Sequence, residues 1–430
     1  MSMHTEFPAG FLWGTATAAH QVEGNNINSD FWVMEHAPGT IFQEPSGDAC
    51  DHYRLYCDDI QTLKDLGFNA YRFSIEWARV EPADGSISKA ALRHYADVLA
   101  TCHEYGITPI VTLHHFTSPR WLMKLGGWES AETPKRFEAY TQAVMRELGS
   151  LIPYVCTINE ANIAVLLRRM NMNAGAQSDG DSQAPIGVNA DSAGGSFAAW
   201  MQACAQELNT PLDKLKTFLF TSTDAAQTLI RDAHARARDA IKSANPATQV
   251  GITLALNDVQ TLPGGEALAA TIKDEQFFSY LPACADDDFI GVQNYTRQRI
   301  GAEGVLPNEA GVETTQMGYE YYPEALEGVI RMVAAAGKPM IVTENGLSTE
   351  DDSRRVAFIQ RALAGVRRCL DDGLDVRGYV YWSALDNFEW VFGYRPKFGL
   401  IDVDRATQQR RVKESGRYLG NIARRNALGE

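Results

Sequence analysis

The feature of this sequence that most constrains its fold is a regular alternation of short apolar runs with segments of helical periodicity. Residues 51–66 carry apolar side chains at helical spacing, Gly67 can take the left-handed conformation that ends a helix, and 70–75 resumes as a strand. The cycle then repeats along the chain. The pattern predicts eight strands, near 11–17, 70–75, 109–113, 154–160, 250–256, 288–295, 339–344 and 376–383.

Strands that alternate with helices pair in parallel, and eight such units favour a closed (β/α)8 barrel, the TIM barrel, in the α/β class. A length of 430 residues would allow two or three domains, but a barrel with extended βα loops reaches this size as one unit. We therefore predict one domain over residues 1–430. The aperiodic stretch 171–196, rich in Asn, Ala, Gly, Ser and Asp, is predicted to be a mobile loop.

Composition and charge exclude several classes of partner. The chain is 45% hydrophobic and 22% charged, as in a globular enzyme, and its net charge is -15. Nucleic acid and anionic membranes attract basic patches, which the sequence lacks, so a small neutral ligand fits better. The seven cysteines form no C-x-x-C pair and are predicted to be reduced thiols. Without a signal segment or a membrane-spanning run, the sequence predicts a cytoplasmic protein.

Two glutamates stand at the ends of predicted strands. Glu160 closes the run Thr157-Ile158-Asn159-Glu160, and Glu344 lies in Ile341-Val342-Thr343-Glu344-Asn345-Gly346. A carboxylate at the end of a buried strand is costly unless it projects into a functional cavity. Taken singly, Glu160 could be held by backbone amides and Glu344 could open a turn. Because functional residues gather at the carboxyl ends of barrel strands, the two are predicted to share one site, as glycoside cleavage requires.

A set of further motifs resembles family 1 glycoside hydrolases, the β-glucosidase family, over nearly the full chain. Each run is weak alone, but together and in this order they are specific. The runs are Gln21-Val22-Glu23-Gly24, Tyr71-Arg72-Phe73-Ser74-Ile75-Glu76-Trp77, Thr112-Leu113-His114-His115-Phe116, Thr157 to Glu160, Asn294-Tyr295, Thr343 to Gly346, Trp382, and Asp386-Asn387-Phe388-Glu389-Trp390.

The resemblance implies a retaining mechanism with Glu344 as nucleophile and Glu160 as general acid and then base. Arg72 and Tyr295, which the family places beside the nucleophile, would keep Glu344 charged, whereas its surroundings should raise the pKa of Glu160. Retention predicts carboxyl groups about 5–5.5 Å apart. The resemblance further implies an apolar floor under the sugar ring at Trp382 and hydroxyl contacts from Gln21, His115, Asn159, Glu389 and Trp390, with Asn159 on the 2-hydroxyl.

One position that matches the family pattern and three that differ from it bear on the choice of substrate. A Glu389 carboxylate near O4 and O6 would repel a 6-phosphate, which favours an unphosphorylated sugar. Ala161 replaces the proline that usually follows the acid, and Asn162 and Tyr319 replace aromatic residues that are common in the family. Asn162 and Tyr319 are predicted to contact the leaving group, whose identity stays open. We expect terminal β-glucose to be removed, with β-fucose or β-galactose as alternatives.

Several other interpretations remain open from the sequence. Arg72 could pair with another acid, Gln21 could cap a loop, and the tryptophans could be packing residues. His114 and His115 have no third ligand at metal-binding spacing, so no metal or other cofactor is predicted. The predicted partner is a small β-glycoside or β-linked oligosaccharide. Rival functions are transglycosylation and a catalytically silent carbohydrate-binding barrel, and the oligomeric state is not indicated.

Overall fold

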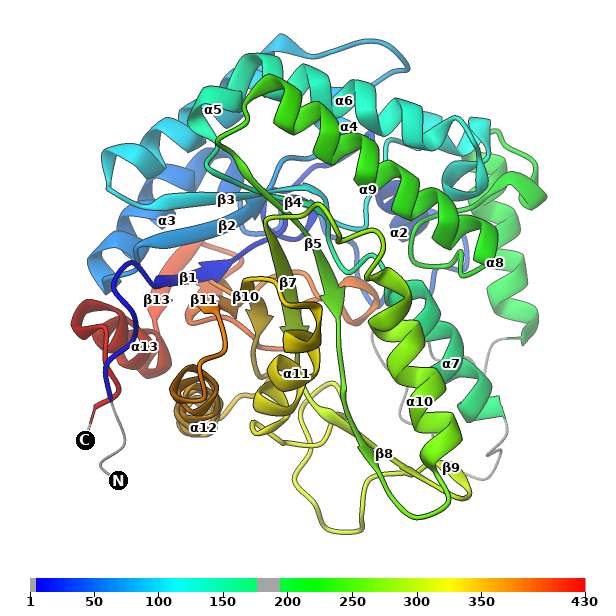
Figure 1. Ribbon diagram of the computed structural model, residues 1–430. Coiled ribbons are helices and arrows are strands. Elements are labelled where there is room, and N and C mark those ends of the chain that lie inside the picture. The colour runs from blue at the N-terminus through cyan, green and yellow to red at the C-terminus, as the bar shows by residue number, and fades with distance from the viewer. Residues whose placement is uncertain (1–4, 176–193, 430) are drawn as a thin grey trace.

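A computed structural model of the protein describes residues 5–175 and 194–429. Its centre is a closed barrel of parallel strands in the order β1-β11-β10-β7-β5-β4-β3-β2, closed by pairing of β1 with β2 (Figure 1). All eight predicted strands are confirmed as barrel strands. They are β1 (Leu12–Ala16), β2 (Ala70–Ser74), β3 (Thr108–His114), β4 (Tyr154–Ile158), β5 (Gln249–Ala255), β7 (Phe289–Asn294), β10 (Met340–Asn345) and β11 (Val376–Trp382).

Helices surround this barrel, as Figure 1 shows for α5, α6 and α9 on one side and α12 on another. The α3 helix ends as predicted at Gly67, whose φ is 102° and whose N–H donates to Leu63 and Lys64. The described helices are α1 (Ala19–Val22), α2 (Asp30–His36), α3 (His52–Leu66), α4 (Trp77–Val80), α5 (Lys89–Glu104), α6 (Thr133–Leu148), α7 (Ile163–Gly175), α8 (Gly194–Glu207), α9 (Asp224–Ala244), α10 (Glu266–Gln276), α11 (Ala325–Val333), α12 (Asp352–Asp371) and α13 (Glu414–Arg425).

Two small sheets extend the loops that follow the barrel strands. The strands β6 (Asp258–Thr261) and β8 (Arg297–Gly301) follow β5 and β7 and pair in parallel, and β9 (Gly304–Val305) pairs with β8. Beyond β11, β12 (Ile401–Asp404) and β13 (Gln409–Val412) form an antiparallel hairpin. The prediction of a (β/α)8 barrel with extended βα loops is therefore confirmed.

The predicted loop over 171–196 is partly wrong. Residues 171–175 continue α7, and 194–196 begin α8, while 176–193 lie outside the described residues. The helix runs on through 171–175 because Met and Ala favour helical backbone and no proline interrupts it before Gly175. The polar, aperiodic pattern of this stretch therefore did not reveal that α7 continues through 171–175.

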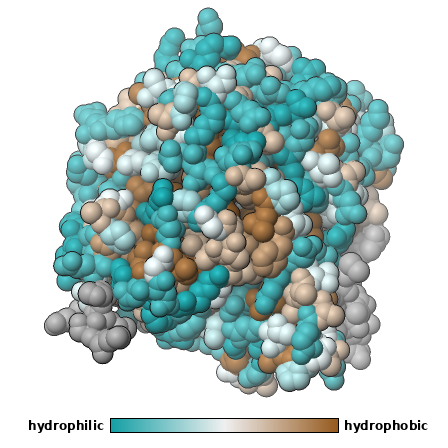
Figure 2. Space-filling model, viewed as in Figure 1, coloured by the Kyte–Doolittle hydropathy of each residue, from teal (hydrophilic) through white to brown (hydrophobic). Residues whose placement is uncertain are grey.

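One large hydrophobic cluster runs through the described chain, from Phe7 near its start to Ile422 near its end. This continuity favours the interpretation of the chain as one domain, which stays a prediction. The face shown in Figure 2 is mainly hydrophilic, with scattered apolar groups. All seven cysteines are unpaired thiols, as predicted. None of the described helices combines the length and the apolar character that a membrane crossing needs.

Candidate active site

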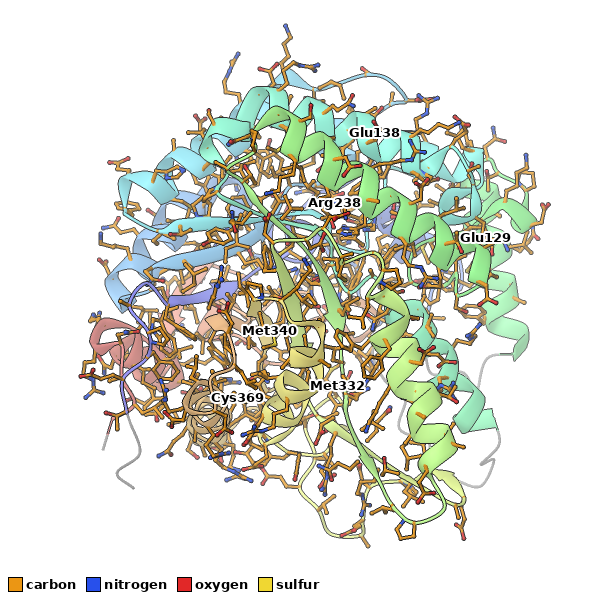
Figure 3. The ribbon with its side chains drawn as sticks, in the orientation of Figure 1. Glu129, Glu138, Arg238, Met332, Met340 and Cys369 are labelled. Atoms are coloured by element: carbon orange, nitrogen blue, oxygen red, sulfur yellow. The ribbon has the colours of Figure 1, made fainter. Side chains whose placement is uncertain are left out.

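The two predicted glutamates line one pocket at the carboxyl ends of the barrel strands. Figure 3 marks Met340, the buried first residue of β10, in the interior of the molecule, and Glu344 lies further along that strand. Glu160 lies two residues beyond the end of β4 rather than within the strand, which corrects the predicted boundary. The residues that line the pocket are His115, Phe116, Glu160, Tyr295, Tyr319, Glu344, Trp382, Glu389, Trp390 and Phe398.

Glu344 is held by two donors, one from β2 across the barrel and one directly after the neighbouring strand β7. Arg72 on β2 places Nη1 2.6 Å from Glu344 Oε1, and the Tyr295 hydroxyl donates to Oε2 at 2.6 Å. Arg72 is fully buried, so its pairing with Glu344 leaves little room for the alternative that it neutralises another acid. Burial raises the pKa of Glu344 above its usual value, and the Arg72 charge and the Tyr295 hydrogen bond limit this rise. These two contacts favour the ionised form.

Glu160 has the opposite electrostatic surroundings. Its side chain is almost fully buried, and within the described part of the chain it forms no ion pair. Burial, the negative charge of Glu344 and, to a smaller extent, that of Glu389 raise the pKa of Glu160 well above its usual value, against the opposing charge of Arg72. A proton shared between the two carboxyl groups therefore resides on Glu160. The surroundings thus favour the proton on Glu160 and the charge on Glu344.

Asn159 connects Arg72, the partner of Glu344, to His115. Its Oδ1 accepts from Arg72 Nη2 at 2.5 Å and from Gln293 Nε2 at 2.8 Å, and its Nδ2 lies 3.3 Å from His115 Nε2. Burial lowers the pKa of His115 well below its usual value, with the Arg72 charge acting in the same direction, so the ring is neutral. Nε2 then accepts from Asn159, and Nδ1 carries the proton. Among the described residues that buried Nδ1 has no partner, which leaves a donor for a ligand.

Gln21 and Glu389 meet on the other side of the pocket. Gln21 lies in α1, where its Nε2 donates to the Phe388 carbonyl at 2.8 Å and to Glu389 Oε2 at 3.4 Å. Its amide therefore holds the loop that carries Glu389. Burial and the charge of Glu344 raise the pKa of Glu389 to about 8, and the Gln21 hydrogen bond opposes this rise. Burial and the Glu344 charge thus favour the protonated form of Glu389.

Three residues that line the pocket have left-handed backbone conformations. Phe116 has φ 69°, Glu160 has φ 44°, and Trp390, at the start of the short 3-10 helix η7 (Trp390–Phe392), has φ 49°. For a residue other than glycine each such conformation costs roughly 1–2 kcal/mol, and it persists only where the surrounding structure imposes it. Strained backbone of this kind is common at functional sites.

The structure corrects one predicted contact and adds two. Asn162 is fully buried, and its amide donates to the carbonyls of Ala255 and Gln276 and accepts from the Ala255 N–H, so it supports the loop and does not reach the leaving group. Tyr319 lines the pocket as predicted. Phe116 and Phe398 also line it and were not predicted as binding residues.

The sequence held a signal for one of the two missed residues. Phe116 could have been predicted from the sequence because it ends the Thr112 to Phe116 motif, whereas Phe398 belongs to no motif.

The two adjacent histidines do not form a metal site together. His114 Nε2 lies 3.1 Å from the Ser118 hydroxyl, whereas His115 lines the pocket. In residues 5–175 and 194–429 no three metal-binding side chains converge.

Comparison with known proteins agrees with this geometry. The family model described as glycosyl hydrolase family 1 matches residues 3–184 and 276–428. The chain belongs to glycosyl hydrolase family 1. It is 31% identical to thermostable β-glucosidase B of Thermobispora bispora over 98% of this chain and 91% of that protein. It is 28% identical to β-glucosidase A of Acetivibrio thermocellus, which covers 98% and 99% of the two chains.

Solved structures of family 1 enzymes share the barrel. The crystal structure of β-glycosidase BGL167 is 50% identical, has a TM-score of 0.89, and covers 99% of this chain and 98% of its own. A β-glycosidase from Pyrococcus horikoshii is 32% identical with a TM-score of 0.80, covering 100% and 97%. This family 1 protein is therefore a glycoside hydrolase built on a TIM barrel.

The contact between Tyr295 and Glu344 generates a pH-dependent prediction. Tyr295→Phe removes a hydrogen bond that lowers the pKa of Glu344, so the pKa rises and Glu344 is protonated at higher pH. The acid limb of kcat/KM should move to higher pH. The maximum should fall about tenfold to a hundredfold, because a hydrogen bond to a charged group contributes about 1.5–3 kcal/mol.

The matched control is Tyr140→Phe, which removes a buried hydroxyl that donates to Ile75 and Leu113 outside the pocket lining. Its acid limb should stay where it is in the wild type. An unshifted acid limb in Tyr295→Phe would show that Tyr295 does not control the ionisation of Glu344.

Proposed function

We propose that this protein is a retaining exo-β-glycosidase that releases terminal, non-reducing β-D-glycosyl residues, with β-glucose as the preferred sugar and β-fucose and β-galactose as alternatives. The observation that carries the proposal is the unequal pair of carboxyl groups in one pocket. Glu344 has a cation and a hydroxyl donor that favour its charge, whereas burial and negative charge favour the proton on Glu160. Glycoside cleavage with retention requires this division of roles.

In the first half-reaction, a Glu344 oxygen attacks the anomeric carbon while Glu160 gives its proton to the departing glycosidic oxygen. The products are a glycosyl ester on Glu344 and the free aglycone alcohol. We propose that the two carboxyl groups lie about 5–5.5 Å apart, the separation that direct attack requires. Arg72 and Tyr295 hold the attacking carboxylate by its two oxygens and so orient it toward the sugar.

In the second half-reaction, a water molecule attacks the same carbon and Glu160 takes its proton. Ester formation removes the negative charge of Glu344, which is one of the causes that raise the pKa of Glu160. The pKa of Glu160 therefore falls when the ester forms. Glu160, which has just given up its proton, stays deprotonated and can act as the base in the second step. Cleavage of the ester returns Glu344 to its charged form, and the sugar leaves with its β configuration.

The sugar would bind through two kinds of surface. We propose that Trp382 lies against the C–H face of the ring, in line with its stack on His115 at 5.6 Å and 18° between ring planes. The hydroxyl groups would meet the polar edge of the pocket. Its proposed members are His115, Glu389 and Trp390, which line the pocket, with Gln21 and Asn159, which contact Glu389 and His115 from outside the lining.

A phosphorylated sugar fits this pocket poorly. None of the described residues that line it is Lys or Arg, so a 6-phosphate would lack a cation. The charge repulsion expected from Glu389 operates fully only above its pKa of about 8. The β-glucosidase of Thermotoga maritima, 26% identical with a TM-score of 0.80, was solved with deoxynojirimycin, which supports a small unphosphorylated glycoside as the ligand.

The rival functions lead to different measurements. Transglycosylation uses the same glycosyl ester but an alcohol in place of water, and product analysis with added alcohol distinguishes the two. A silent carbohydrate-binding barrel would bind sugars without turnover, and the paired carboxyl groups argue against it. A cytoplasmic location and a metal-free reaction stay predictions of the sequence.

The direct test of the function follows hydrolysis of aryl β-glucoside, β-fucoside and β-galactoside by proton NMR. We expect the first sugar released to be the β anomer, and Glu344→Ala to have no measurable hydrolysis because the attacking group is missing. Release of the α anomer first would contradict retention. A wild-type protein that binds sugars but releases none would support the silent barrel.

A second prediction concerns the acid. Glu160→Ala should slow alkyl glucosides far more than glucosides of acidic phenols, because a good leaving group needs little protonation. Steady-state rates on one alkyl and several aryl β-glucosides measure the difference. Equal losses across the whole series would count against Glu160 as the proton donor.

A further inference from the structure

A buried imidazole–carboxylate pair lies outside the pocket and takes no part in the proposed chemistry. His20 sits on α1 directly before Gln21 and is 1% exposed. Its Nε2 is 2.6 Å from Oε1 of Glu35 on α2, and both side chains are fully shielded from solvent. Glu35 Oε2 accepts from the N–H and hydroxyl of Ser46 at 2.9 and 2.7 Å. Neither His20 nor Glu35 lines the pocket described above.

The contacts of the ring fit an imidazolium once the Asn26 amide is turned about its last bond. Asn26 Nδ2 lies 3.0 Å from His20 Nδ1, while Asn26 Oδ1 is buried without a partner among the described residues. Turning this amide would let Oδ1 accept a proton carried on Nδ1 and would satisfy both groups. Burial lowers the pKa of His20, but Glu35, with smaller contributions from Glu76 and Asp30, raises it above its usual value.

The charged ring stacks against a wall of the sugar pocket. The His20 and Trp390 rings are almost parallel, with centroids 5.8 Å apart and 8° between their planes. On the pocket side, Trp390 is nearly parallel to His115, at 6.1 Å and 18°, and His115 is nearly parallel to Trp382, at 5.6 Å and 18°. Three of these four rings line the pocket. His20 is the member of the series that lies behind it.

We propose that His20 is a positioning residue for sugar binding: paired with Glu35, its charged ring holds the Trp390 indole in the orientation that receives the sugar. A cation on the face of an indole is favourable, and more so where water is excluded. Trp390 needs such support because its backbone is left-handed, with φ 49°. The inference rests on the proposed function, because Trp390 is taken as part of the sugar site.

The competing interpretation is a buried ion pair that stabilises the fold and nothing else. The chain offers a matched control in His52 and Asp59, whose Nδ1 and Oδ2 atoms lie 2.7 Å apart and are also buried. The aromatic neighbour of His52 is Tyr71, at 6.1 Å and edge-on, which does not line the pocket. Removing His52 should therefore lower stability without affecting sugar binding.

The experiment measures kcat, KM and thermal stability on an aryl β-glucoside for H20F, E35Q, the double variant H20F/E35Q and the control H52F. Phenylalanine keeps a flat ring but has no charge, and glutamine keeps the shape of Glu35 but cannot ion-pair. We expect KM to rise about tenfold in H20F and E35Q with a smaller change in kcat, since the indole contact is made in ground and transition states alike. The KM of the double variant should be no higher than that of the more impaired single variant, because both changes break the same His20–Glu35 pair.

The proposal is overturned if H20F and E35Q are folded and their KM stays within about twofold of the wild type, or if H52F raises KM as much as they do. Should H20F fail to fold, E35Q alone decides by the same criterion. The failure of the proposed function is a separate result. If the wild type cleaves no β-glycoside, calorimetric binding of deoxynojirimycin replaces KM, and unchanged affinity in the two variants overturns the role of His20.

Discussion

The buried contact between Arg72 and Glu344 is the interaction on which the site depends. Arg72 comes from β2, Glu344 from β10, and the same guanidinium reaches Asn159 beyond β4. A fully buried charge without a partner would be strongly destabilising, so Arg72 and Glu344 require each other. Only a closed barrel brings these three strand ends together. The fold and the charge state of Glu344 are therefore linked.

This contact also makes the electrostatic surroundings of Glu344 and Glu160 unequal, as the proposed reaction requires. Glu344 has Arg72 and Tyr295 as partners, whereas Glu160 faces the negative charge of Glu344 and forms no ion pair within the described chain. Two identical side chains in one pocket thus differ in protonation because of their neighbours. The left-handed backbone at Glu160 helps to set its position, at an energetic cost that the surrounding barrel offsets.

The sequence predicted the parts of this structure that depend on local pattern. Apolar runs located all eight barrel strands, and the motifs around Arg72, Glu160 and Glu344 located the centre of the site. Asn162 was misassigned because its amide is satisfied by Ala255 and Gln276, both distant in the sequence. The same limit explains Phe398, which becomes a pocket residue only when the chain after β11 folds back over the barrel mouth.

The central claim is that Glu344 forms a covalent ester with the sugar while Glu160 supplies the proton. It is tested most directly by mass spectrometry after reaction with a β-glucoside whose 2-hydroxyl is replaced by fluorine and whose leaving group is a dinitrophenolate. Fluorine slows both the formation and the hydrolysis of the ester. The acidic phenol is a good leaving group and restores the rate of formation, so the ester accumulates. The account predicts one fluoroglucosyl group on the peptide that contains Glu344. A label on any other residue, or rapid release of phenol with no label, would contradict it.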